Sequence, residues 1–364
     1  MEEKIFAFWL CNLPGIGHRK IEYLLAYFGS PKAIFFGREH HFAQIQGLQE
    51  KDRKLLSQKR TEDSLKKSYE KVCKRGISFA YREEKSYPEK FRQLSDMPYG
   101  IYYKGRLPEQ NIPSIAVVGA REASHGGRQI ADKLSFELAE NGIQVISGLA
   151  RGIDIAAHRG ALKAARGKTY AVLGTGVDIC YPGQHIETYM MMQESGGVLS
   201  EFPIQSPALP YHFPIRNRII SGLSDGILVI EAGKKSGSLI TAEVGLEQGK
   251  EIFVVPGSIA DSRYEGGNEL LKSGAVLVTG VRDILDGLGL FYDCDVIERK
   301  KKIDDMLETT EKMVYAMLSL EPMHISEIVE KTGLSPAAVM ESLLSMQMRH
   351  LVQAIGNHYF TIKL

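Results

Sequence analysis

The clearest structural signal in the sequence is the segment GILVIEAGKKSGSLITA, residues 226–242. Its first five residues form an apolar run without alternation, which is typical of a parallel strand that is covered on both faces. A turn of glycine, serine and two lysines follows, and the chain then continues as a helix. Two arginines precede the strand in FPIRNRIISGLS, residues 213–224. Cations on glycine-containing turns predict a phosphate site, for either a free nucleotide or a nucleic-acid backbone.

The same order of strand, glycine-containing turn and helix is repeated between residues 111 and 290. Six further apolar runs are predicted as strands: SIAVVGA (114–120), IQVISG (143–148), KTYAVLG (168–174), GGVLSEF (196–202), EIFVVPG (251–257) and AVLVTG (275–280). Helical stretches such as RQIADKLSFELAENG (128–142) lie between them. Repeated units of this kind predict an α/β fold with a Rossmann-like, doubly wound, mostly parallel sheet.

Composition divides the chain into four parts. Residues 1–70 have a helical pattern, and residues 71–290 hold the predicted sheet with its leading segment. Residues 291–305 form a charged stretch that is interpreted as a linker. Residues 306–364 predict three helices followed by a hairpin, with Pro336 placed in the first turn of the third helix. Three helices and a hairpin are typical of a winged helix.

The N-terminal part contains one short glycine motif, LPGIGHRK, at residues 13–20. It fits the turn of a helix-hairpin-helix, in which backbone N–H groups can point at a nucleic-acid phosphate. It fits a simple turn within a helical bundle equally well, because a lone glycine motif of this length is not specific. Both interpretations stay open at this point.

The bulk composition limits the kind of partner. Among 364 residues, 45 lysines and arginines oppose 44 aspartates and glutamates, so a polyanion must be met by a local patch of charge. No segment approaches the roughly 18 apolar residues of a membrane span, and the start of the chain does not resemble a signal peptide. We expect a soluble cytoplasmic protein.

The four cysteines are Cys11, Cys73, Cys180 and Cys294. They are scattered along the chain and form no CxxC pair, so neither a disulfide framework nor a metal site is expected.

Glycine and cations follow the first two predicted strands of the sheet. Arg121 stands two residues after Gly119, at the edge where ligands of α/β sheets bind, and its planar fork suits phosphate. The dinucleotide motif GxGxxG is absent there, so no cofactor is expected. Ser147 and Gly148 end the second strand before a helix and allow a ligand to approach the backbone.

Two further features at strand ends have alternative interpretations. Asp154 and His158 lie four residues apart and form either a catalytic pair or a helix cap beside a packed histidine. The second interpretation is favoured because no nucleophile accompanies the pair. In LGTGVDICYPGQH, residues 173–185, Tyr181 is expected to shape the turn rather than to stack on a base.

The segment around the 226–230 strand carries the densest set of candidates. Arg216 and Arg218 flank Asn217, so one arginine should face the cleft while the other braces the scaffold. Phe213 is a candidate platform for stacking a base. A cation, hydroxyl groups and backbone donors should converge at the start of the next helix, at Lys235, Ser236, Gly237 and Ser238.

Taken together, these motifs resemble the DNA-processing protein A family, DprA or Smf. The matching segments cover most of residues 111–260 in order: VVGAREAS (117–124), SGLARGIDIAAHRGAL (147–162), AVLGTGVDICYPGQ (171–184), LSEFP (199–203), the run 213–242 and GKEIFVVPGS (249–258). The resemblance implies a Rossmann-like domain that binds single-stranded DNA, forms a homodimer and helps load the RecA recombinase in natural transformation. By motif position it implies a DNA pocket of Arg121, Ser147, Gly148, Phe213, Arg216, Asn217, Lys235, Ser236 and Gly237, beside which lie Arg218 and Ser238.

Two other functions can be read from the same sequence. The sheet also resembles the lysine-decarboxylase-like phosphoribohydrolases, whose PGGxGTxxE motif would place Thr241 where that family has its catalytic glutamate; Glu243 lies two residues on. The missing acid favours a protein that binds rather than an enzyme. The winged helix allows a transcriptional regulator, but SPAAVMESLLSMQMRHL, residues 335–351, is nearly uncharged before Arg349 and suits contacts between proteins.

Overall fold

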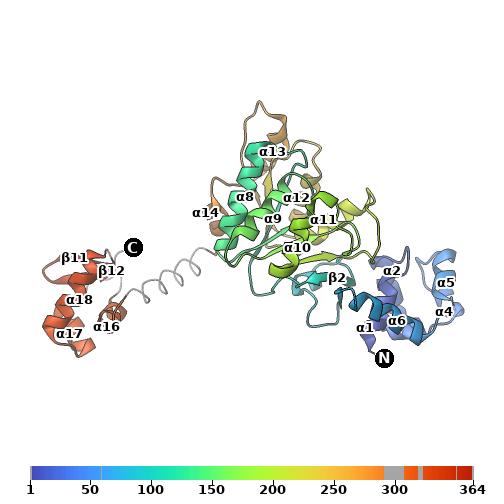
Figure 1. The fold of residues 1–364 in the computed structure, drawn as a ribbon, viewed down its shortest axis with the longest axis horizontal. Coiled ribbons are helices and arrows are strands. Elements are labelled where there is room, and N and C mark those ends of the chain that lie inside the picture. The colour runs from blue at the N-terminus through green and yellow to red at the C-terminus, as the bar shows by residue number, and fades with distance from the viewer. Residues whose placement is uncertain (1, 59, 291–306, 319–322, 350, 363–364) are drawn as a thin grey trace. The chain divides into compact units, whose positions relative to one another are not determined.

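A computed structural model describes residues 2–58, 60–290, 307–318, 323–349 and 351–362. The chain divides into two compact units, Met1–Leu290 and Phe291–Leu364. Figure 1 shows the helices and strands of both units. The predicted linker at 291–305 lies outside the described residues. No helix in the described parts of the chain is long and apolar enough to cross a membrane.

A nine-stranded sheet forms the centre of the first unit, in the order β1-β2-β6-β5-β4-β3-β7-β8-β9. The seven strands from β6 to β9 in that order run parallel, whereas β1 and β2 pair antiparallel at one edge. The predicted doubly wound, mostly parallel sheet is therefore confirmed, although β1 and β2 were not predicted. The strands are β1 (Ser78–Tyr81), β2 (Gly100–Gly105), β3 (Ser114–Gly119), β4 (Gln144–Ser147), β5 (Thr169–Val172), β6 (Gly197–Ser200), β7 (Gly226–Ile230), β8 (Glu251–Val254) and β9 (Val276–Leu277).

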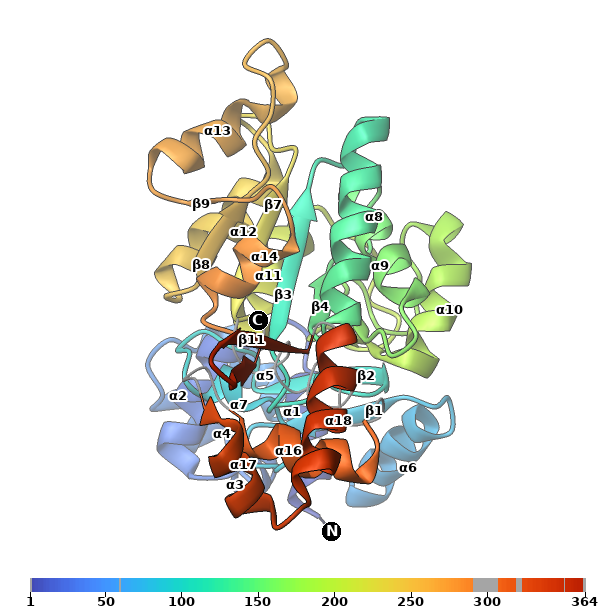
Figure 2. The same ribbon diagram turned by 90° about the vertical axis from the view of Figure 1, so that its left-hand side faces the viewer.

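Helices cover the sheet in two groups, which Figure 2 shows on either side of β3. The first group packs together and consists of α8 (His125–Glu140), α9 (Ile153–Lys163) and α10 (Ile186–Ser195). The second contains α11 (His212–Leu223) packed on α12 (Gly237–Glu247). Every residue of β4, β5 and β7 is buried between them, which explains why these strands lack a polar face in the sequence. The shorter helices of this part are α7 (Glu89–Arg92), α13 (Glu265–Lys272) and α14 (Val281–Gly287).

The strand order reverses between β3 and β7, which pair in parallel from Ile115 opposite Gly226 to Gly119 opposite Ile230. From β3 the chain proceeds outward to β6, and from β7 it proceeds in the other direction to β9. The loops that leave β3 and β7 therefore diverge and open a crevice at the carboxyl ends of the strands. This position is where open α/β sheets bind their ligands.

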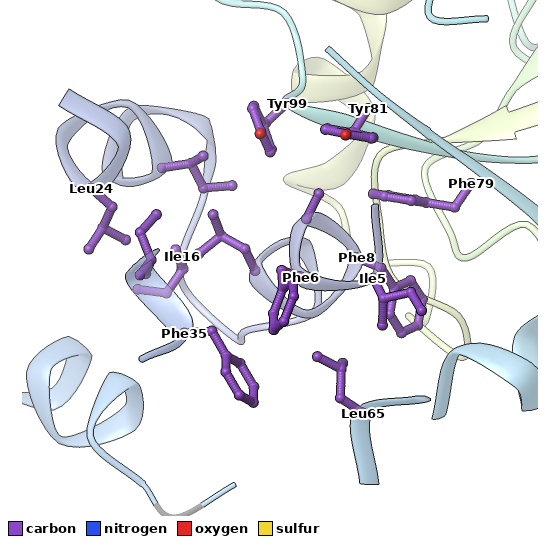
Figure 3. Packing of buried hydrophobic residues seen from close by; sticks show 14 of the residues in the cluster. Ile5, Phe6, Phe8, Ile16, Leu24, Phe35, Leu65, Phe79, Tyr81 and Tyr99 are labelled. Carbon is purple, nitrogen blue, oxygen red and sulfur yellow. The ribbon is translucent and has the colours of Figure 1, made fainter. Parts of the chain in front are cut away.

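Six helices precede the sheet and share a core with its antiparallel edge. Figure 3 shows Phe8 of α1 near Phe79 of β1, whereas Phe6 of the same helix points toward Phe35. A boundary at residue 70 stays a prediction, since the helical core continues into β1 and β2. The helices are α1 (Glu3–Cys11), α2 (His18–Phe28), α3 (Pro31–Phe35), α4 (Glu39–Ala43), α5 (Glu50–Leu56) and α6 (Glu62–Cys73).

The glycine motif at residues 13–20 forms the turn between α1 and α2. Gly15 has a φ of +76°, a conformation that favours glycine. Lys20 Nζ donates to the carbonyl oxygen of Gly15 and to the buried carboxylate of Asp52, each at 2.8 Å. The charge of this lysine is therefore already paired within the helical part.

The second unit has the predicted winged-helix fold. Its helices α16 (Thr309–Met317), α17 (Ile325–Thr332) and α18 (Pro336–Met348) pack around one small core. An antiparallel sheet in the order β10-β12-β11 completes it, formed by β10 (Met323–His324), β11 (Val352–Gly356) and β12 (Tyr359–Ile362). Pro336 begins α18, and the Ser335 side chain caps this helix by accepting from the Ala338 N–H at 3.3 Å.

Candidate functional site

A cavity of about 740 Å³ lies at the carboxyl ends of β3 and β7, where the strand order reverses. It is lined by the loops after β3 and β7, the start of α9, one side of α11, the start of α12 and part of the loop after β8. The structure brings most of the predicted site residues together in this lining: Arg121, Phe213, Arg216, Asn217, Lys235, Ser236, Gly237 and Ser238. Ser147, Gly148 and Arg218 are not part of the lining.

Two exposed cations of the cavity have no carboxylate partner. Arg121 and Lys235 form no ion pair with any residue of the described ranges. In contrast, Lys234 Nζ lies 3.6 Å from Glu265, and Arg263 pairs with Asp261 at 2.6 Å. Arg121 and Lys235 are therefore the cations that are available to an anionic ligand.

The N-terminus of α12 adds partial positive charge and one backbone donor, the Gly237 N–H, beside Lys235. Ser236 caps this helix, because its hydroxyl accepts from the Ser238 N–H at 3.4 Å and lies 2.7 Å from the Ser238 hydroxyl. Gly237 begins the helix, and a Cβ built there would meet no atom within 4 Å. The N–H groups of Ser238 and Leu239 already donate to Ser236, so the Gly237 N–H is the donor of this first turn that an anion can approach.

Arg216 forms the floor of the cavity and is only 4% exposed. Its Nη1 donates to the carbonyl oxygen of Gly148 at 2.7 Å and also to that of Val172. Burial lowers the pKa of Arg216 to about 10, while the nearby Asp154 carboxylate raises it. The guanidinium therefore stays charged at neutral pH and is held in place by the backbone.

Gly148 and Ser147 help to hold Arg216 and the neighbouring strand ends in position. A side chain at position 148 would overlap the Arg216 guanidinium, so the close approach requires glycine. The Ser147 hydroxyl is buried and donates to the carbonyl oxygen of Val117 at 2.6 Å. Both residues therefore position Arg216 and the strand ends instead of facing the cavity.

Arg218 lies outside the cavity and braces the scaffold. It is buried, and its Nη2 pairs with the buried carboxylate of Glu201. Burial raises the pKa of Glu201, whereas the Arg218 charge lowers it. Of the two arginines that flank Asn217, the structure thus assigns Arg216 to the cavity and Arg218 to the interior.

The geometry supports a packed position for His158, but the predicted helix-cap role of Asp154 is wrong, because Gly152 is the N-cap of α9 and no side chain caps this helix. Asp154 Oδ2 accepts from the N–H groups of Gly148 and Ala150, at 3.1 and 3.4 Å, and burial raises the pKa of this carboxyl group. His158 Nδ1 lies 2.7 Å from Thr169 Oγ1 of β5. Burial lowers the pKa of His158 to about 3, so the ring is neutral at physiological pH.

Glu231 is a residue of this region that the sequence did not predict. It directly follows β7 with a φ of +51°, and its carboxylate accepts from the Ser124 N–H at 2.7 Å and from the Tyr264 hydroxyl at 3.1 Å. It thereby ties the loops after β3 and β8 to the end of β7. Its partners are far away in the sequence, so only the order of the strands could have revealed it.

The residues compared with the phosphoribohydrolase motif occupy different places on α12. Thr241 is buried and lines the cavity, whereas Glu243 is exposed and does not line it. Among the described residues, no group of three or more histidine, cysteine, aspartate or glutamate side chains is placed to hold a metal ion.

Comparison with known proteins relates the chain to one family. Residues 78–289 match the family described as DNA recombination-mediator protein A, and residues 299–356 match the DprA winged helix domain. Protein Smf of Escherichia coli is 37% identical over 282 residues, which cover 76% of this chain and 75% of that protein. The DNA processing protein DprA of Streptococcus pneumoniae is 43% identical over 199 residues, which cover 55% of this chain and 70% of that protein.

Two solved structures of such proteins are also similar. The X-ray structure of DprA from Streptococcus pneumoniae matches with a TM-score of 0.62 and 33% identity, over 79% of this chain and 98% of that one. A Helicobacter pylori DprA structure, described for its single-stranded DNA binding mode, matches with a TM-score of 0.52 and 28% identity, over 59% of this chain and 98% of that one. Since the family match spans more than half of the chain and the winged helix matches as well, this protein belongs to the DNA-processing protein A (DprA/Smf) family.

Proposed function

We propose that this protein binds single-stranded DNA at the carboxyl edge of its parallel sheet. The observation that carries the proposal is the convergence of two unpaired cations, Arg121 and Lys235, with the N-terminus of α12 on one cavity. Behind them Arg216 adds a fixed positive charge. Together they supply positive charge and a backbone N–H donor for phosphates of one strand.

Two observations favour a single strand over a duplex. Phe213 lies in the lining of the cavity, so a ring is available beside the cations, and stacking on a ring requires an unpaired base. The similar Helicobacter pylori protein is described by its single-stranded DNA binding mode. The names of the curated relatives, which describe DNA processing, agree with this proposal.

The wider role is proposed from family membership. We propose that the protein works in the cytoplasm as a homodimer and helps load the RecA recombinase onto the bound strand during natural transformation. We also propose that it binds DNA without cleaving nucleotides, since Thr241 stands where the phosphoribohydrolases have their acid and the exposed Glu243 does not line the cavity. The cavity then acts as a phosphate cradle.

A titration over a salt series tests the binding proposal. The purified protein is titrated with a labelled oligonucleotide, as a single strand and as a duplex, between about 50 and 200 mM salt. We expect clear preference for the single strand, and each neutralised phosphate should contribute about −0.7 to the slope of log affinity against log salt. Equal affinity for the duplex, or a slope near zero, would refute the proposal. Release of free base from nucleoside monophosphates in a parallel incubation would favour the enzyme instead.

A further inference from the structure

Tyr181 is an exposed aromatic residue directly beside the cavity. It lies in the loop after β5, and 49% of its surface is exposed. Its ring centroid is 5.8 Å from that of Phe213, with an angle of 38° between the planes. Phe213 in turn lines the cavity, so the loop after β5 extends the aromatic surface beyond the lining residues.

Phe213 itself is half-buried, so only part of its ring is open to a base. The Arg121 guanidinium carbon lies 5.3 Å from its ring centroid, and the Tyr181 ring packs against it at a tilt. The backbone at Gly174 also packs closely, since a Cβ built there would come within 2.9 Å of the Phe213 ring. Tyr181, by contrast, contacts one aromatic ring among the described residues and leaves about half of its surface open.

The loop that carries Tyr181 is held by hydrogen bonds on both sides. Before it, the Thr175 hydroxyl donates to the carbonyl oxygen of Ile179 at 2.9 Å. After it, the His185 N–H donates to the carbonyl oxygen of Pro182 at 3.1 Å, and the His185 ring lies 2.9 Å from the carbonyl oxygen of Leu149. A ligand that binds to Tyr181 therefore has little loop entropy to overcome.

We propose that Tyr181 is a base-stacking position, on which a nucleobase of the bound single strand rests. This inference rests on the proposed function and extends it to Tyr181, which the sequence predicts only to shape a turn. Arg121, a cation available for phosphate, and Tyr181 contact the same Phe213 ring. A phosphate and a neighbouring base of one strand can thus be held together. The bases of a duplex are paired and stacked, so this contact also discriminates against double-stranded DNA.

Substitutions of the full-length protein test the stacking contact. Tyr181→Ala removes the ring, Tyr181→Leu keeps apolar bulk without a ring, and Tyr181→Phe keeps the ring. Tyr27→Ala is the matched control, because Tyr27 of α2 is 45% exposed and does not line the cavity. A stacking contact is worth about 1–3 kcal/mol, so Tyr181→Ala should weaken single-strand binding by about 5-fold or more. Tyr181→Phe and Tyr27→Ala should stay within about twofold of wild type, with Tyr181→Leu in between.

A strand without bases separates stacking from contacts to the backbone. The wild type and Tyr181→Ala are titrated with an oligonucleotide built wholly of abasic units, which keeps the phosphates and removes the rings. On this strand the two proteins should bind equally, and on ordinary DNA both should have the same salt slope, because stacking releases no counterion. Thermal unfolding of each variant verifies that the fold is intact.

Several results would overturn the inference. If Tyr181→Ala binds the single strand within twofold of wild type, Tyr181 makes no stacking contact. An equal loss on ordinary and abasic strands, or a flatter salt slope, would assign Tyr181 to the phosphate contacts. If the wild type itself does not bind the single strand, both the proposed function and this inference fail. The wild-type titration therefore distinguishes the two failures.

Discussion

Arg216 Nη1 donates a hydrogen bond of 2.7 Å to the carbonyl oxygen of Gly148, which ties the middle of α11 to the end of β4. The same nitrogen donates to Val172 of β5. Three segments that are distant in the sequence thus meet at one buried cation. This contact separates the cations of the site into two kinds: Arg216 holds the cavity together, whereas Arg121 and Lys235 remain available to a ligand.

We expect Arg216→Ala to destabilise the protein. The substitution leaves two buried carbonyl oxygens without their donor and opens space below the cavity, and each unpaired buried group costs about 1–3 kcal/mol. The free energy of unfolding, measured by urea denaturation, should fall by roughly 2–4 kcal/mol. Arg121→Ala is the control, because this exposed side chain should change stability by less than about 0.5 kcal/mol. Equal stability of the two variants would show that the Gly148 contact is not structural.

Two glycines of the site should differ sharply when replaced by alanine. At Gly148 a methyl group overlaps the Arg216 guanidinium, which is buried and cannot move without breaking its bonds to two carbonyl groups. We expect Gly148→Ala to lower the free energy of unfolding by about 1–3 kcal/mol, as for other overpacked sites. At Gly237 a methyl group meets no atom within 4 Å, so Gly237→Ala should change stability by less than about 1 kcal/mol. Urea denaturation of both variants checks this, and a neutral Gly148→Ala would contradict the packing described above.

The sequence predicted the sheet well because its strands are covered on both faces. Each run such as GILVI is apolar throughout, and the order of such runs with helices between them is enough for the fold class. The edge strands β1 and β2 escaped prediction, because their runs SFAY and GIYYKG are short or partly exposed and lack the continuous apolar pattern of the buried parallel strands. In the sheet, β1 pairs with β2, and β2 pairs with β6.

The residue types of the candidate site could be predicted from the sequence, but their arrangement in space was predicted less well. Glycine, serine and cations at strand ends identified the cavity, since parallel strands bring their carboxyl ends to one edge. Which arginine faces the cavity depends on the rotation of α11, and this is set by packing against β4 and β5. The sequence could therefore offer Arg216 and Arg218 only as alternatives. Tyr181 and Glu231 lie within segments that match the family, but their contacts are recognised only from their neighbours in space.

Lys235→Ala and Arg121→Ala should each weaken single-stranded DNA binding and flatten its salt dependence. Each substitution removes one proposed phosphate contact, so the slope of log affinity against log salt should become less negative by about 0.7. Neither variant should acquire a sequence preference, because phosphate contacts do not read bases. Lys133→Ala on α8 is the control, as this exposed lysine does not line the cavity. If both cavity variants bind like wild type, these cations are ordinary solvated charges.

His158 should make the protein less stable in mild acid. Its pKa in the folded state is about 3, below the ordinary value of 6.5, so between these values the unfolded chain binds more protons than the folded one. The contribution of the neutral ring to stability is therefore complete above pH 6.5 and is lost as the pH falls toward 3, by up to about 1.4 kcal/mol per pH unit. His158→Asn keeps a polar partner for Thr169 and removes the titration. Urea denaturation at pH 7, 6 and 5 should show a smaller loss of unfolding free energy for this variant than for wild type. An equal loss in both proteins would contradict the assignment of this pH dependence to His158.

Removal of residues 306–364 should leave most of the single-strand affinity intact. The cavity and its cations belong entirely to the first unit, which has its own core and extends to Leu290. In the winged helix, α18 carries no basic residue between Pro336 and Met348, and Arg349 directly after it pairs with Glu311 at 3.2 Å. That surface is therefore poorly suited to hold phosphates. We expect the truncated protein to bind a single strand within about tenfold of the full chain, or ~1.4 kcal/mol, when circular dichroism verifies that it is folded. A larger loss in a folded truncation would move the main DNA contact to the winged helix.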